Sequence, residues 1–288
     1  MTTNSCYIKS PLNYMGGKYR ILNEIMPLLT GRNTEVFYDV FAGGFNVGIN
    51  SDASKIVCND QITYLIDMFQ VFSTETFDDL MLKINERIST YNLSKTNAKG
   101  YNALREHYNN SKNTLDLFVL TCFSFNHQIR FNSNHKLNVP FGKNRSAFNK
   151  SIKNNLKNFT DALHKKKVEF LTKDFRELDY NKLTKNDLAY FDPPYLISTG
   201  TYNDGKRGFN DWGEAEEKEL LCLLDFLDSR GIAFALSNVM YNKGLSNDLL
   251  IKWAKNYQVH YINNSFANCS YHYKDRTKET VEVLITNY

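Results

Sequence analysis

The sequence Leu188-Ala189-Tyr190-Phe191-Asp192-Pro193-Pro194-Tyr195 runs from an apolar segment directly into a carboxylate, two prolines and an aromatic ring. Proline fixes φ and has no N–H to donate, so a strand over 188–191 must end here. The rigid loop that follows presents one carboxylate, proline carbonyls and one ring face. This array suits a planar heterocycle whose exocyclic amine donates to Asp192 and to a proline carbonyl while Tyr195 stacks on the ring. The alternative is an ordinary Pro-Pro turn that closes a buried strand.

A second motif lies far upstream, where an apolar run over 36–41 is followed by Ala42-Gly43-Gly44-Phe45-Asn46-Val47-Gly48. A strand, a glycine turn and then a helix open a dinucleotide-type α/β unit. The sequence contains neither GxGxxG nor a GxxxxGK[ST] phosphate loop, which disfavours a nicotinamide or a nucleoside triphosphate. The next apolar run, 55–58, ends at Asn59-Asp60, and an acid in this position suits the two hydroxyls of a ribose. Glycines needed only for packing and Asp60 as a helix cap are the alternatives.

Two weaker motifs complete the set. Tyr14-Met15-Gly16-Gly17-Lys18 precedes a helical pattern over 19–29, and paired glycines before a helix offer backbone N–H groups to an anion. Asp174-Phe175 follows the apolar run 168–171, where an acid and a ring suit the amine and the face of adenine. Asp174 fits a helix cap equally well.

In this order the motifs resemble the Dam-type (D12 class, α-group) DNA adenine-N6 methyltransferases, nearly from end to end of the chain. The resemblance also includes the closing segment 282–287, Glu-Val-Leu-Ile-Thr-Asn. It implies an α/β fold: a Rossmann-like S-adenosylmethionine-dependent methyltransferase sheet with helices on both faces. Residues 1–60 and 166–288 would form this catalytic domain. Residues 61–165, mainly helical by pattern with one β-hairpin, would be an inserted DNA-recognition domain.

The resemblance also implies site residues and a chemistry. The catalytic residues would be Asp192, Pro193, Pro194 and Tyr195. The cofactor S-adenosylmethionine would be bound by Tyr14, Gly16, Gly17, Lys18, Phe41, Gly43, Gly44, Asp60, Asp174, Phe175 and Asp192. The target adenine must leave the duplex to reach such a pocket. There, acceptors for both amine hydrogens would free the nitrogen lone pair for direct methyl transfer, driven by positioning and electrostatics.

The expected hairpin has arms at 128–132 and 136–140 around the turn 133–135, and it is similar to the family's DNA-reading hairpin. The expected DNA contacts are Asn13, Asn126, Gln128, Arg130, Asn132, Pro140 and Lys143. Arg130 is the candidate for bidentate guanine readout, with a phosphate contact or an ion pair within the hairpin as alternatives. Asn13 replaces the family's usual lysine, Phe45 its usual third small residue, and Gln128 the leucine of GATC-specific members. We therefore expect this chain to share the family's chemistry, but we do not assign it the GATC target sequence.

Composition agrees with this interpretation. The 288-residue chain has a net charge of +4, but residues 126–185 hold 14 Lys and Arg against 5 Asp and Glu, a local charge of +9 that favours a phosphate backbone. Its five cysteines form no CxxC pair, no His/Cys cluster has metal-ligand spacing, and no apolar run of about twenty residues predicts a membrane span. We therefore expect no metal, no membrane and a cytoplasmic location. The polar stretch 197–211 would close over the flipped base or merely connect a strand to a helix.

The predicted function is site-specific adenine-N6 methylation of double-stranded DNA, either as the modification enzyme of a restriction–modification system or as an orphan or phage methylase. A cognate restriction endonuclease would act separately. The alternatives are a non-catalytic DNA-binding module on the same scaffold, an RNA adenine methyltransferase and a DNA cytosine-N4 methyltransferase.

Overall fold

A single mixed sheet forms the centre of the molecule in a computed structural model that describes residues 7–197, 212–262 and 280–288. Its strand order is β3-β2-β1-β4-β5-β8-β7, with β6 paired to β5. The first five strands in this order are parallel, and β8 runs antiparallel to both of its neighbours. The strands are β1 Val36–Asp39, β2 Lys55–Asn59, β3 Val168–Leu171, β4 Leu188–Phe191, β5 Ala233–Asn242, β6 Leu245–Ser246, β7 Gln258–Tyr261 and β8 Thr280–Thr286.

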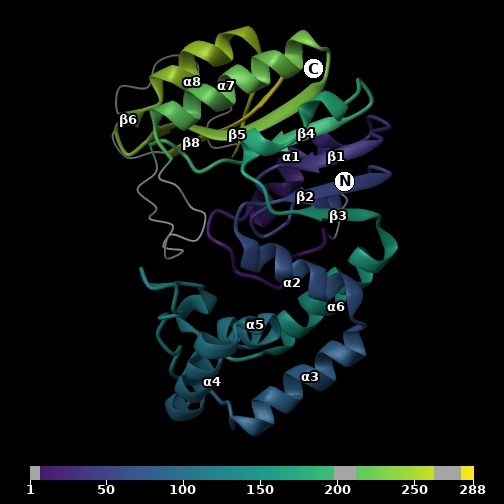
Figure 1. The fold of residues 1–288 in the computed structure, drawn as a ribbon. Coiled ribbons are helices and arrows are strands. Elements are labelled where there is room, and N and C mark those ends of the chain that lie inside the picture. Colours follow the sequence, from purple (N-terminus) through teal and green to yellow (C-terminus); the bar gives the residue numbers. More distant parts are fainter. Residues whose placement is uncertain (1–6, 198–211, 263–279) are drawn as a thin grey trace, which may run out of the picture.

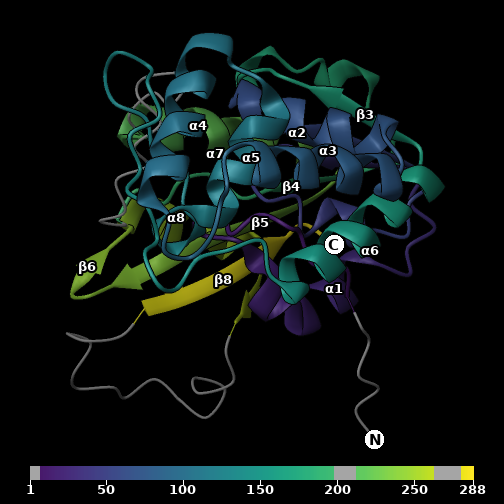
Figure 2. The same cartoon turned by 90° about the horizontal axis from the view of Figure 1, so that it is seen from below.

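Strand β4 shows why helices cover both faces of this sheet. Its four residues are all buried, and successive side chains point to opposite faces. Leu188 and Tyr190 pack with α1 (Leu22–Leu29), while Ala189 and Phe191 pack with α7 (Glu214–Ser229) and α8 (Asp248–Trp253). Figure 2 shows α1 and α7 on opposite sides of the strands. A parallel strand that reads as a continuous apolar run is typical of this arrangement. The expected α/β sheet with helices on both faces is confirmed, and the sheet is mostly parallel.

The strands predicted from the apolar runs are present, and so is the helix over 214–229. The helical pattern over 19–29 forms a 3-10 turn, η1 (Lys18–Ile21), that continues into α1. The helix expected after the glycine turn is wrong, because only the 3-10 turn η2 (Gly48–Asn50) forms there. Asn46 and Asn50 instead bind backbone groups of the extended segment at Ile8 and Ser10, which holds this stretch in a loop.

The chain between Thr63 and Lys165 is mainly helical, as expected, and lies below the sheet in Figure 1. Its helices are α2 Thr63–Thr74, α3 Phe77–Thr90, α4 Ala98–Ser111, α5 Thr114–Phe123 and α6 Lys150–Lys165. One hydrophobic cluster runs without a break from Ile56 and Cys58 of β2, through Phe69 of α2, to Leu117 of α5 and Phe159 of α6. The helical group is thus packed onto the β2–β3 end of the sheet through a shared core.

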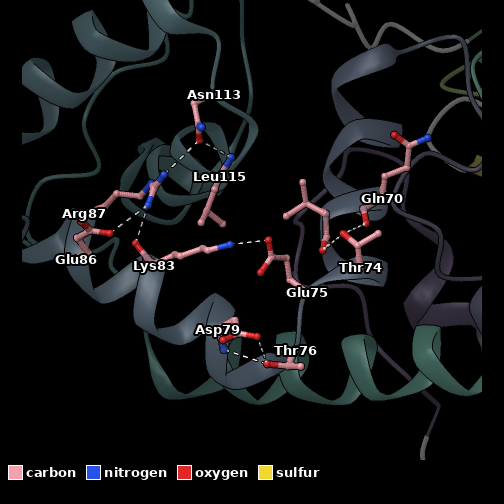
Figure 3. A network of polar contacts seen from close by, with 11 residues as sticks. Gln70, Thr74, Glu75, Thr76, Asp79, Lys83, Glu86, Arg87, Asn113 and Leu115 are labelled. Atoms are coloured by element: carbon pink, nitrogen blue, oxygen red, sulfur yellow. Dashed lines mark hydrogen bonds and ion pairs between the residues drawn. The ribbon is translucent and has the colours of Figure 1, made fainter.

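Polar contacts fix how α3 and α5 begin (Figure 3). Thr76 caps α3 by accepting from the Asp79 N–H at 3.1 Å, and Asn113 caps α5 by accepting from the N–H groups of Leu115 and Asp116. The two helices are joined by Arg87 of α3, whose Nε lies 2.6 Å from the buried carboxylate of Asp116. Caps of this kind satisfy N–H groups that a helix cannot pair internally.

The hairpin expected over 126–142 is only partly right. The chain does turn back on itself, with antiparallel bridges at Phe131–Leu137 and Ser124–Phe141, but these bridges are isolated and no regular strand forms in this stretch. Asn132 holds the turn, because its side chain accepts from the N–H groups of Asn134 and Lys136. Phe131 and Leu137 are buried against the helices. The Asn132 N–H donates to the Lys136 carbonyl and the Asn138 N–H to the Arg130 carbonyl, each at 3.0 Å, so packing and a few backbone hydrogen bonds together fix the loop.

The polar stretch 197–211 lies outside the described residues apart from Ile197. Among the helices that are described, none is both long enough and apolar enough to cross a membrane.

Candidate active site

One cavity lies at the carboxyl ends of β1 and β4. These strands are neighbours although about 150 residues separate them in the chain, and sheet order reverses between them, which is where open α/β sheets bind ligands. Most of the predicted catalytic and cofactor residues line it: Tyr14, Gly16, Gly17, Lys18, Phe41, Gly43, Gly44, Asp60, Asp192, Pro193, Pro194 and Tyr195. It is also lined by residues that were not predicted: Met15, Asp39, Ala42, Asn46, Val47, Gln61, Ile62 and Tyr190.

The glycine turn leaves no space for side chains on this wall. Gly43 has a φ of +48°, and a Cβ there would lie 3.0 Å from the Tyr14 ring. A Cβ on Gly44 would lie 2.9 Å from Nδ2 of Asn46. The turn therefore brings backbone to the cavity surface, as close approach of a ligand requires.

Asp60 is held in place by the turn it faces. Its Oδ2 accepts from the Gly43 N–H at 2.8 Å and its Oδ1 from the Ile62 N–H at 2.9 Å. Burial raises its pKa to about 6, against the lowering effect of these two N–H groups. Each carboxylate oxygen still has a second lone pair, so the group can accept from a pair of ribose hydroxyls.

Asp39 is a cavity residue that the sequence interpretation missed. It is 1% exposed; Oδ2 accepts from the Gly48 N–H at 2.9 Å, while Oδ1 is buried and has no hydrogen-bond partner. Burial first, and then the nearby Asp192 and Asp60, raise its pKa to about 8. The signal was an acid at the end of an otherwise apolar strand. With the glycine cradle and Asp60, an unsatisfied acceptor fits a polar ligand such as the donor that the resemblance implies.

Asp192 lies at the opposite wall, where β4 ends. Its Oδ1 lies 2.8 Å from Nζ of Lys18 and accepts from the Tyr195 hydroxyl at 3.0 Å. Burial raises the pKa of Asp192, and the Lys18 ammonium opposes this rise. The carboxylate is therefore already placed to accept a hydrogen bond from a nitrogen inside the cavity.

Glu282 of β8 is a second acid that sequence reasoning did not assign to the site. Its Oε1 lies 3.8 Å from Nζ of Lys18 and 3.3 Å from the Tyr195 hydroxyl. Burial raises its pKa, while Lys18 lowers it. The available signal was one carboxylate within the apolar strand pattern of 281–286.

Asp174 and Phe175 do not line this cavity. Asp174 caps the short helix η4 (Phe175–Glu177), and its Oδ1 lies 2.7 Å from Nε of Arg176, whose hydrogen bonds lower the Asp174 pKa. Phe175 is buried and packs against Phe41, a cavity residue, with ring centroids 5.5 Å apart. Trp212 contacts both rings.

The expected DNA contacts are gathered on the loop that follows α5. Asn13 joins it from the N-terminal segment, since its Nδ2 donates to the Asn126 carbonyl at 2.9 Å. Arg130 is exposed but held across the loop, where Nε donates to Oδ1 of Asn138 at 3.0 Å and Nη2 to its carbonyl at 3.1 Å. Asn132 is used within the turn, whereas the remaining candidates on this loop are exposed: Gln128, Pro140 and Lys143.

No three His, Cys, Asp or Glu side chains come close enough to hold a metal ion in the part of the chain that the structure describes.

Comparison with known proteins gives one consistent match. The family model of the D12 class N6 adenine-specific DNA methyltransferases matches residues 14–268. The chain is 48% identical over 286 residues to the type II methyltransferase M.FokI of Planomicrobium okeanokoites and 49% identical over 284 residues to the modification methylase StsI of Streptococcus sanguinis. These alignments cover 99% and 98% of this chain but only 44% and 43% of the relatives, so the chain spans less than half of their length.

A more distant relative is matched over most of both chains. The DNA adenine methylase of Salmonella typhi is 25% identical over 232 residues, which is 79% of this chain and 79% of that protein. A family model that covers most of the sequence, together with relatives close to half identical, is decisive. The chain belongs to the D12 class of N6 adenine-specific DNA methyltransferases.

Proposed function

We propose that this chain transfers a methyl group from S-adenosylmethionine to the N6 amine of a specific adenine in double-stranded DNA. The observation that carries the proposal is the Asp192 carboxylate, which already binds an N–H donor, the Lys18 ammonium, at 2.8 Å inside a cavity shared with Asp60 and the glycine turn. One cavity thus contains an acceptor suited to an amine, Asp192, and a backbone turn and acid suited to a nucleoside, Gly43-Gly44 and Asp60. S-adenosylmethionine supplies an electrophilic methyl group when it is bound.

The residues of the chain would divide the work. Gly43, Gly44 and Asp60, with Asp39 at the base of the turn, would bind the donor. Asp192 and a proline carbonyl of the 192–195 loop would accept the two hydrogens of the target amine. The Tyr195 ring would hold the base by stacking, worth roughly 1–3 kcal/mol. Positioning of this kind can supply a large part of the rate acceleration.

We propose that the helical segment 61–165 is the recognition part of the molecule and that the loop 126–142 reads the target site. The exposed Gln128 and Arg130 of this loop, the exposed Lys143 directly after it, and the hydrogen bond from Asn13 to the Asn126 carbonyl support this role. The names of M.FokI and StsI support a place in a restriction–modification system, with a separate cognate endonuclease. Such an enzyme would act in the cytoplasm of a bacterial cell.

The test is to incubate the protein with duplex DNA and S-adenosylmethionine and to identify the modified nucleosides by mass spectrometry. N6-methyladenine is the expected product. N4-methylcytosine, a product formed on RNA alone, or no product would each support one of the rival functions. Sequencing of the methylated DNA with base-modification readout then gives the target site.

The role of Asp192 has its own test. Asp192→Ala should abolish methyl transfer, because the amine loses its acceptor, while the affinity for S-adenosylmethionine is retained through the opposite wall. The rate is measured in a single turnover and the affinity by calorimetry. Retention of more than a few per cent of the activity would remove Asp192 from the proposed chemistry.

A further inference from the structure

Lys18 stands between two carboxylates that come from different strands. Its Nζ lies 2.8 Å from Oδ1 of Asp192, at the end of β4, and 3.8 Å from Oε1 of Glu282, on β8. It also donates to the Gly16 carbonyl at 3.0 Å, and its side chain is 6% exposed. The buried Lys18 ammonium is thus in contact with Asp192, and Glu282 lies only about 1 Å farther from it.

This arrangement conflicts with the proposed role of Asp192, on which the present inference rests. A target amine must donate to the same carboxylate whose Oδ1 already binds Lys18 and Tyr195. A charged donor binds a carboxylate more strongly than a neutral amine does, so the base does not displace the ammonium from Oδ1 by competition alone. A carboxylate neutralised by an ammonium is also a weaker acceptor at its other oxygen. Releasing a buried ammonium with no new partner would be costly, because a buried charge that loses its partner is strongly destabilising.

Glu282 resolves the conflict because it offers Lys18 a second partner within reach of a small side-chain movement. The side chain is 22% exposed, and its ion-pair contact among the described residues is Lys18. The neighbouring strand β5 has a register shift between Val239 and Tyr241, directly opposite Glu282 and Val281. The extra residue, Met240, lies on β5, and bulges of this type are over-represented beside active sites.

Tyr195 connects the same two acids. Its hydroxyl lies 3.0 Å from Oδ1 of Asp192 and 3.3 Å from Oε1 of Glu282, and a single O–H donates fully to one of them at a time. When the ammonium moves toward Glu282, the Tyr195 hydroxyl can keep its hydrogen bond to Oδ1 of Asp192, and only the position that Lys18 held becomes available. The exchange moves no proton between groups, since two carboxylates and one ammonium remain.

We propose that Glu282 is a positioning residue that receives the Lys18 ammonium when the target amine reaches Asp192. In the free enzyme Lys18 holds the place of the amine and neutralises Asp192. When the base enters, Lys18 moves to Glu282, and Asp192 becomes available to the base. Glu282 acts through Lys18 and does not contact the base.

The first experiment compares Glu282→Gln with Glu24→Gln in single-turnover methylation of duplex DNA at saturating S-adenosylmethionine. Glu24 is a matched control on α1, because its charge also raises the pKa of Glu282. We expect Glu282→Gln to slow methyl transfer by about tenfold or more, while the melting temperature and the affinities for DNA and S-adenosylmethionine stay unchanged. Glu24→Gln should keep the wild-type rate. A wild-type rate in Glu282→Gln overturns the proposal.

The second experiment separates this role from a structural one. Without a second acid, Lys18 stays on Asp192 and blocks the base, so removing the ammonium should help. Lys18→Met in the Glu282→Gln background should therefore methylate faster than Glu282→Gln alone, and 2-aminopurine at the target position should report more flipped base. A double variant that is as slow as Glu282→Gln, or slower, overturns the proposal.

Failure of the proposed function has a different signature. If Asp192→Ala keeps its activity, Asp192 does not accept the amine, and the proposed chemistry is wrong whatever the Glu282 variants do. If Asp192→Ala is inactive and the double variant gives no recovery, only the role of Glu282 is wrong.

Discussion

Asp39 has one hydrogen-bond donor, the Gly48 N–H, for two buried carboxylate oxygens. Burial and the neighbouring Asp192 and Asp60 raise its pKa from 3.8 to about 8. Between these two pH values the folded protein keeps a proton that the unfolded chain has lost. The contribution of Asp39 to stability must therefore fall as pH rises through this window and level off above it. A ligand that donates a hydrogen bond to Oδ1 would stabilise the charged form of Asp39 and lower this pKa.

Asp39→Asn tests whether the raised Asp39 pKa causes this pH dependence. The amide is the same size as the carboxylate and can still accept from the Gly48 N–H, but it cannot ionise. We expect the variant to be more stable than the wild type, by a margin that grows by about 1.4 kcal/mol per pH unit up to the folded-state pKa. Urea unfolding of both proteins at about pH 5, 7 and 9 measures the margin. Stability curves that run parallel would show that Asp39 is ionised in the folded protein.

The residues of the site differ in how well the sequence predicted them. Asp192, Asp60 and the glycine turn follow strands whose ends are marked by proline, polar residues or glycine, so their place at one sheet edge was predictable. Asp39 is the last residue of β1 and Glu282 lies within β8, and neither is directly followed by a turn residue. Their role depends on which strands become neighbours, and the pairing of β5 with β8 brings Glu282 toward Lys18. The sequence left open whether Asp174 caps a helix or binds a ligand. In the structure it caps η4, and its carboxylate pairs with Arg176.

At the scale of elements, helices and strands were predicted best where apolar periodicity was long. Strand β4 and helix α7 match their predictions closely, whereas the loop 126–142 does not form regular strands. Its polar residues bind locally: Asn132 closes the turn, and Asn138 holds Arg130. Local side-chain hydrogen bonds of this kind compete with a strand ladder and are not visible in an alternating pattern.

The junction of α3 and α5 depends on a buried ion pair, and Arg87→Ala tests it. Asp116 is 4% exposed, with Nε of Arg87 at 2.6 Å and Nε2 of His107 farther away at 3.6 Å. Loss of Arg87 leaves a buried carboxylate without its main partner, so we expect a loss of about 3–5 kcal/mol in the free energy of unfolding. Lys157→Ala, which breaks the exposed pair with Asp161 on α6, should cost about 1 kcal/mol or less. Equal losses in the two variants would contradict this distinction.

At the scale of the whole molecule, positive charge is concentrated on the segment 126–185, which carries +9 against +4 for the entire chain. Part of this charge is neutralised locally, since Lys157 pairs with Asp161 and Arg176 with Asp174 and Glu219. The loop 126–142 is the first part of this segment, and Arg130 within it and Lys143 directly after it are exposed. Sequence-specific and purely electrostatic contacts should therefore be separable on one surface.

Arg130→Ala and Lys143→Ala should fail in different ways. Asn138 orients the Arg130 guanidinium, which suits paired acceptors on guanine, so its loss should relax specificity at one position by about 1–3 kcal/mol. Loss of Lys143, as a phosphate contact, should weaken binding equally on all sequences and reduce the salt slope by about one unit. Methylation rates on the target and on single-base variants at two salt concentrations measure both effects. A uniform loss on all sequences in Arg130→Ala would assign Arg130 to the backbone.

The pairing of β1 with β4 has a consequence for how the chain folds. These neighbours are joined across an interval of about 150 residues, and Val36 donates its N–H to Asp187, 151 residues away. Contacts of such long range make folding slow, because the loop must close before they form. During synthesis the residues of helices α2–α6 are made before those of β4, so one edge of β1 has no partner strand until β4 follows. Both walls of the cavity come together only at that step, and the ability to bind ligand is therefore a late event in folding.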